Sequence, residues 1–188
     1  MTDFSERTRV FAQIAAVAWV ISSVIWSVVA GFNRFGEDGN VMNLIGWVVL
    51  VAAGVFTLLA MLGVAPAHHR SPVVKAGIAV YALGLAATVV VFWAVPLWAA
   101  LYSIAMVLFA IGLPQVRRAT LIVAGAMAAG VAAFVVLTAL RVGTPDSYGD
   151  YPIAWAISYF LATMGAALGS FVLSRRVTSS QDNIPAAV

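Results

Sequence analysis

The sequence predicts an all-α, polytopic membrane protein: a compact bundle of six transmembrane helices with both termini in the cytoplasm. Three observations support this fold class. Of the 188 residues, 63% are hydrophobic and only 9% are charged, whereas an average soluble chain is about 25% charged. The charged residues divide the chain into uncharged stretches long enough to cross a bilayer. The basic residues also gather on one side of these stretches, as they do in membrane proteins.

The first two predicted helices are uncharged stretches that begin after a charged residue. Residues 11–31 follow Arg9, and residues 42–66 follow Asp38. Each is long enough for one crossing, which takes about 20 apolar residues. A cleaved signal peptide is the alternative for residues 11–31, but the apolar core of such a peptide has only about 7–15 residues. We therefore expect the first stretch to remain as a membrane helix.

The next two helices share a single uncharged stretch. No residue from Ala76 to Val116 is charged, which is roughly twice the length needed for one crossing. Pro96 lies near its middle, and proline disfavours the helical conformation of the residue before it while fitting the first turn of a new helix. The sequence therefore predicts two helices, residues 74–95 and 97–115.

The last two helices are again uncharged stretches with charged residues at both ends. They cover residues 119–140 and 152–174, and each fits one crossing. The six helices should form one transmembrane domain, residues 1–176. Residues 177–188 are rich in small and polar residues without a hydrophobic period, so we expect a disordered cytoplasmic tail.

The basic residues predict the orientation of the bundle. With six crossings the two termini share a side, and eight of the ten basic residues fall on it. These eight are Arg7, Arg9, Arg70, Lys75, Arg117, Arg118, Arg175 and Arg176. Because basic residues favour the cytoplasmic side, both termini should be cytoplasmic, with Arg34 and Arg141 outside. Short loops and this bias indicate a multi-pass protein of a cell membrane, most simply a bacterial plasma membrane.

Small residues recur at four-residue spacing in the last two helices. Helix 119–140 carries Ala124 and Ala128, and helix 152–174 carries the GxxxG pair Gly165 and Gly169. Because lipid gives no hydrophobic drive for helix association, contact depends on such residues, which let backbones approach. We expect them to pack the bundle internally. The alternative is that they dock a partner membrane subunit.

The composition excludes several kinds of chemistry. Without Cys there is no disulfide, thiolate metal site or iron–sulfur cluster. No ionisable residue lies at mid-depth in a predicted helix, which argues against a proton relay. His68 and His69 are adjacent in a turn, so they cannot sandwich a haem. We therefore predict no cofactor, no metal site and no nucleic-acid partner.

Aromatic residues suggest where a ligand binds. Five of the six tryptophans lie in the predicted outer halves of their helices. The sequence predicts an outward-facing aromatic pocket for an apolar or amphipathic small molecule, with two arginines or the carboxylates of the outer loops orienting its polar end. Its candidate residues are Arg34, Trp93, Trp98, Tyr102, Arg141, Trp155 and Tyr159. An interfacial belt of tryptophans facing lipid, with solvated loops, is the alternative.

These features favour a function in small-solute or lipid recognition or transport, as a subunit and without catalysis. In size, six-helix topology and cytoplasmic termini the chain resembles the substrate-binding membrane subunits of energy-coupling-factor transporters. Ala12 and Ala16 are similar to the alanine motif of their first helix, and no ligand motif matches.

Two other functions remain open on the sequence. One is a membrane-embedded enzyme acting on a lipid or isoprenoid, with carboxylates of the outer loops as acid and base. Its candidate residues are Glu37, Asp38, Asp146 and Asp150. The other is a ligand-free accessory subunit of a larger membrane complex.

Overall fold

The computed structural model describes residues 2–31, 41–64, 71–91, 94–143 and 152–179, and it confirms the all-α fold class. Six helices are long and apolar enough to span a membrane. In chain order the helical elements are α1 (Thr2–Gly31), α2 (Val41–Val64), α3 (Pro72–Val90), α4 (Val95–Gly112), the 3-10 turn η2 (Pro114–Val116), α5 (Arg117–Ala139) and α6 (Pro152–Ser179).

The helix ends differ from the sequence prediction mainly where charged residues had been taken as boundaries. Helix α1 begins at Thr2 rather than at residue 11, and α6 continues to Ser179, into the predicted tail. Charge stops a helix from entering the hydrocarbon core, but it does not stop the helix from continuing into the headgroup region. Pro96 lies in the first turn of α4, as predicted, while α3 already ends at Val90.

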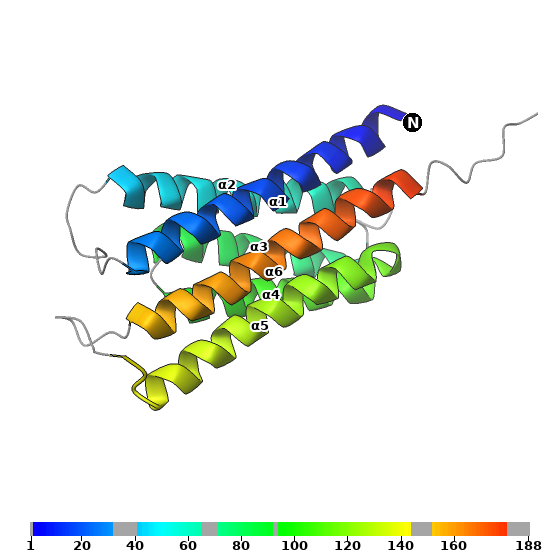
Figure 1. The fold of residues 1–188 in the computed structure, drawn as a ribbon. Helices are drawn as coiled ribbons and strands as arrows, with labels where there is room; N and C mark the ends of the chain where they lie inside the picture. Colours follow the sequence, from blue (N-terminus) through cyan, green and yellow to red (C-terminus); the bar gives the residue numbers. More distant parts are fainter. Residues whose placement is uncertain (1, 32–40, 65–70, 92–93, 144–151, 180–188) are drawn as a thin grey trace, which may run out of the picture.

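The six helices form two layers of three (Figure 1). Helices α1, α6 and α5 make the front layer, in which α6 packs against both of its neighbours. Behind them, α2 packs against α1, and α4 packs against α3 and α5. The N-terminus and the end of α6 lie at the same end of the bundle.

Helices α2 and α3 follow each other in the chain but have little direct contact with each other. Long side chains of α3 bridge the space between them. The hydroxyl of Tyr81 donates a hydrogen bond of 3.0 Å to the backbone carbonyl of Gly54 in α2. A Cβ atom added to Gly54 would lie 3.0 Å from Leu85 Cδ1. Helix α3 is therefore attached to the bundle chiefly through α4.

Helices α5 and α6 approach each other closely because glycine and alanine line their interface. A Cβ atom at Gly130 would lie 2.7 Å from the carbonyl oxygen of Ser158 and 3.0 Å from Ala162 Cβ. Added Cβ atoms at Gly165 and Gly169 would overlap Ala126 and Val123. The GxxxG pair of α6 thus packs within the chain.

A second close approach joins α3 and α4, and the sequence reasoning missed it. Gly77 and Gly84 are seven residues apart on α3, and the rings of Phe109 and Tyr102 are seven apart on α4. A Cβ atom at Gly84 would lie 2.8 Å from Tyr102 Cδ1, and one at Gly77 would lie 3.2 Å from Phe109. The two glycines provide the space that these aromatic rings fill.

The described basic residues are separated between the two ends of the bundle. Seven of them lie at the end where α1 begins and α6 ends, here called the basic end: Arg7, Arg9, Lys75, Arg117, Arg118, Arg175 and Arg176. Arg141 lies at the opposite end, here called the far end, just beyond α5. Among the residues that the structure describes, the basic ones are thus separated as predicted, while Arg34 and Arg70 lie outside those residues and the cytoplasmic location of the basic end stays a prediction.

Candidate functional site

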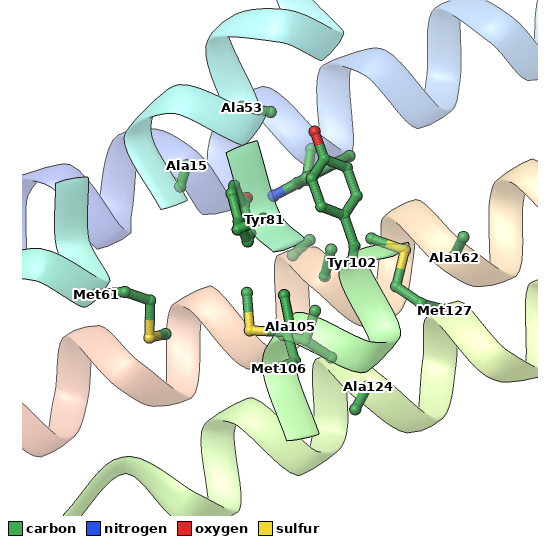
Figure 2. Close-up of a cluster of buried hydrophobic side chains, with 14 of the residues drawn as sticks. Ala15, Ala53, Met61, Tyr81, Tyr102, Ala105, Met106, Ala124, Met127 and Ala162 are labelled. Atoms are coloured by element: carbon green, nitrogen blue, oxygen red, sulfur yellow. The ribbon is translucent and has the colours of Figure 1, made fainter. Parts of the chain in front are cut away.

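Aromatic side chains from four helices meet inside the bundle and form one connected cluster. Its members are Trp19 and Trp26 of α1, Tyr81 of α3, Trp98, Tyr102 and Phe109 of α4, and Trp155 and Tyr159 of α6. Tyr102 lies near its centre, with its ring centroid 4.6 Å from that of Tyr81 and 6.0 Å from that of Trp98. Figure 2 shows Tyr81 and Tyr102 side by side, with Met106 nearby.

Hydrogen bonds tie the polar atoms of this cluster to small hydroxyl residues. The Trp19 indole donates to Thr57 Oγ1 at 3.0 Å, and Thr57 in turn donates to the carbonyl of Ala53. The hydroxyl of Tyr159 lies 2.5 Å from Ser22 Oγ, and that of Tyr102 lies 3.2 Å from Thr88 Oγ1. Because an unmade hydrogen bond is costly in an apolar interior, these pairs fix the orientation of the rings.

The part of the cluster nearest the far end is built on α1 and α6. Trp155 lies in the first turn of α6 and stacks on Tyr159, with ring centroids 4.9 Å apart and ring planes 11° apart. Trp26 meets Trp155 edge to face at 5.6 Å. Trp155 is half-buried whereas Tyr159, which also contacts Trp26 and Trp98, is only 1% exposed.

Two of the described tryptophans at the far end are buried inside the bundle, where they cannot contribute to an interfacial belt. Trp26 is 1% exposed and Trp98 is 0% exposed, and Trp47 is half-buried against the core. An interfacial belt places its indoles at the membrane surface, in contact with headgroups. Trp26 and Trp98 are therefore turned inward and serve the packing of the bundle, while Trp47 and Trp155 stay partly exposed.

The structure brings together four of the seven residues that the sequence singled out. Trp98, Tyr102, Trp155 and Tyr159 belong to the cluster, and the first two share one face of α4 as expected. Arg141 lies apart from them, exposed at the far end. Arg34 and Trp93 lie outside the described residues, so their part in a pocket stays a prediction.

Arg141 has an uncommon backbone conformation. Its φ of 53° lies in the left-handed region, where a helix most often ends on glycine or asparagine. The turn is closed by a hydrogen bond of 3.0 Å from the Arg141 N–H to the carbonyl of Thr138. The backbone of Arg141 is therefore held in a defined turn just beyond the last residue of α5.

One buried hydroxyl beside the cluster has no hydrogen-bond partner among the described residues. Ser23 is fully buried, and its Oγ atom makes no hydrogen bond. It lies four residues after Trp19 and three before Trp26, so all three share a face of α1. Buried polar atoms are nearly always satisfied, which makes this hydroxyl available to a water molecule or to a polar group of a ligand.

The described side chains of the cluster are aromatic rings and small hydroxyl groups. The cluster contains no carboxylate, histidine or lysine, and no group of metal-ligating side chains occurs among the residues that the structure describes. The four carboxylates considered for an enzyme, Glu37, Asp38, Asp146 and Asp150, lie outside those residues. What the cluster offers is flat apolar surface with a few hydroxyl groups.

The sequence reasoning missed the α1 and α3 members of the cluster. Trp19 and Trp26 are seven residues apart and therefore share one face of α1, which was a usable signal. Tyr81 carried no such signal, because its predicted position near the basic end placed it away from the other aromatic residues.

In comparisons with known proteins, the chain matches no family model, no curated protein and no solved structure.

Proposed function

We propose that this multi-pass membrane protein recognises a small apolar or amphipathic molecule at its far end, as a binding or transport component. The observation that supports this proposal is the stacking of a half-buried Trp155 over the buried ring of Tyr159. The aromatic cluster thus reaches the surface at the partly exposed indole of Trp155, and in this proposal a movement of that side chain admits the ligand.

The ligand would replace the indole of Trp155 in its stack. If that side chain turned outward, the face of Tyr159 would be exposed, with the edges of Trp26 and Trp98 beside it at 6.0 and 5.8 Å. A flat apolar group entering this space regains the stacking, which is worth about 0.5–1.5 kcal/mol beyond its buried area.

Native mass spectrometry of the protein, gently extracted from its own membrane, tests this function. We expect wild type to retain a small molecule, and Trp155→Ala to lose it. Phe160→Ala is the matched control, because this ring lies on the same helix but is 48% exposed. A wild-type protein that repeatedly carries no small molecule, or a Trp155→Ala variant that retains it, contradicts the proposal.

A second candidate function, that of an accessory subunit, is supported by the outer face of α5. Ala128, Ala129 and Ala132 are exposed there, and a Cβ atom added to Gly125 would meet nothing within 4 Å. Small residues let another membrane helix approach closely. Among the residues first considered for partner docking, Gly165, Gly169 and Ala124 are used inside the chain, which leaves Ala128.

Co-purification distinguishes this second function from the first. Ala128→Leu should remove a stoichiometric partner chain, because the larger side chain keeps the partner helix away. Val136→Leu is the control, since it enlarges an exposed residue two turns further along α5. Equal retention of the partner by both variants contradicts docking on this face.

A further inference from the structure

A hollow at the basic end lies where α4 turns through η2 into α5. It has a volume of about 530 Å³ and is lined by Pro114, Arg117, Arg118, Leu121 and Ile122. This volume is in the range of small-molecule sites, which is about 300–1,000 Å³. The lining combines two guanidinium groups with apolar side chains and contains no carboxylate.

The electrostatics of this hollow favour an anion. Arg117 and Arg118 are the first two residues of α5, so two cations stand at the positive end of a 23-residue helix. The first turn has no acidic residue, and no side chain caps the helix at Val116. The hydroxyl of Thr120 donates backward, to the carbonyls of Val116 and Arg117. Nothing in this first turn offsets the positive charge.

The apolar part of the lining indicates that the anion belongs to an amphipathic molecule. Leu121 is 44% exposed and Ile122 is half-buried, and both lie one turn further into the membrane-spanning part of α5. A phosphodiester held by the arginines would therefore have apolar side chains directly below it. A free phosphate has no apolar part that could contact these side chains.

We propose that this hollow binds the headgroup of an anionic phospholipid, with Arg117 and Arg118 around the phosphate and Leu121 and Ile122 along the start of an acyl chain. Guanidinium groups suit this role because their planar fork of donors matches the phosphate oxygens. The site is at the opposite end of the bundle from the stack of Trp155 on Tyr159, so the inference is independent of the function proposed above.

The test compares two lipids that differ only in headgroup charge. Delipidated protein is mixed with equal amounts of dioleoylphosphatidylglycerol and dioleoylphosphatidylcholine, and the bound masses are read by native mass spectrometry. We expect wild type to prefer the anionic lipid. The variant Arg117→Gln/Arg118→Gln should lose that preference, by about fivefold for each arginine removed.

Two further variants separate this site from the general charge of the basic end. Lys75→Gln/Arg175→Gln removes the same charge from exposed residues that do not line the hollow, and it should keep the preference. Arg117→Lys/Arg118→Lys keeps the charge but lacks the planar pair of guanidinium donors, so its preference for the anionic lipid should be intermediate. If the double glutamine variant does not fold, each single variant is measured instead.

Three results would overturn the proposal. The first is equal retention of the two lipids by wild type. The second is an equal loss of preference in Lys75→Gln/Arg175→Gln and in Arg117→Gln/Arg118→Gln, which would show a diffuse effect of surface charge. The third is displacement of the lipid by excess glycerophosphoglycerol, the same headgroup without acyl chains, which would indicate a site for soluble phosphate esters.

Discussion

Replacing Gly130 by alanine should loosen the contact between α5 and α6. The new Cβ atom would lie 2.7 Å from the Ser158 carbonyl oxygen and 3.0 Å from Ala162 Cβ. To restore an ordinary contact of 3.4 Å to that oxygen, α5 would have to move away by about 0.7 Å. Because the nearest atom belongs to the backbone of a helix, it cannot turn aside. Overpacking of this kind costs about 1–3 kcal/mol.

A matched control lies five residues earlier on the same helix. Gly125→Ala adds the same atom where nothing lies within 4 Å. Each replacement also gains the helix propensity of alanine over glycine, about 1 kcal/mol, so this gain cancels when the two variants are compared. The free energy of unfolding should therefore be about 1–3 kcal/mol lower for Gly130→Ala than for Gly125→Ala.

The assay is reversible unfolding in mixed micelles, with the denaturing detergent titrated against the folded protein and both variants measured beside wild type. The reasoning is refuted if the two variants unfold at the same detergent fraction. It is also refuted if Gly130→Ala is the more stable of the two, since the backbone of Ser158 would then not limit the space at Gly130.

Three further predictions concern other parts of the chain. The first concerns orientation and uses single cysteines, since the chain has none of its own. Arg141→Cys at the far end should react with a membrane-impermeant maleimide on intact cells, whereas Gln115→Cys at the basic end should react only after permeabilisation. The reverse pattern would show that the basic end faces outward. The second concerns the 2.5 Å hydrogen bond between the hydroxyls of Tyr159 and Ser22. In a double-mutant cycle of Tyr159→Phe and Ser22→Ala, the free energies of unfolding should show a coupling of about 0.6 kcal/mol. Strictly additive losses would mean that this hydrogen bond does not contribute to stability. Gly84→Ala places a Cβ atom 2.8 Å from a buried ring carbon of α4, so in the same micelle titration it should be about 1–3 kcal/mol less stable than Gly125→Ala, and equal stability of these two variants would show that α3 shifts freely on α4.

The number of helices and the separation of charge could be predicted from the sequence because both follow from one physical cost. A charge placed in hydrocarbon is expensive, so charged residues mark the limits of each span along the chain. The same rule failed at the helix ends. Helix α1 includes Arg7 and Arg9 because, beyond the hydrocarbon core, a helix can carry charge.

The candidate site could be predicted only in part. The shared face of Trp98 and Tyr102 follows from their four-residue spacing on α4, and so does that of Trp155 and Tyr159 on α6. Their meeting with Trp19 and Tyr81 depends on how α1, α3, α4 and α6 are placed around one another, which no local pattern specifies.

By itself the sequence determined that this is an all-α chain with six apolar helices and a basic end. Only the tertiary structure decided which face of each helix is turned inward. In a soluble protein hydrophobicity marks the buried face, but lipid and protein core are both apolar, so this signal is lost in a membrane. Trp98 is therefore buried where a lipid-facing belt was equally compatible with the sequence, and Gly130 is enclosed while Gly125 on the same helix is open. What distinguishes them is the fit of shapes between helices, which exists only once the helices have packed.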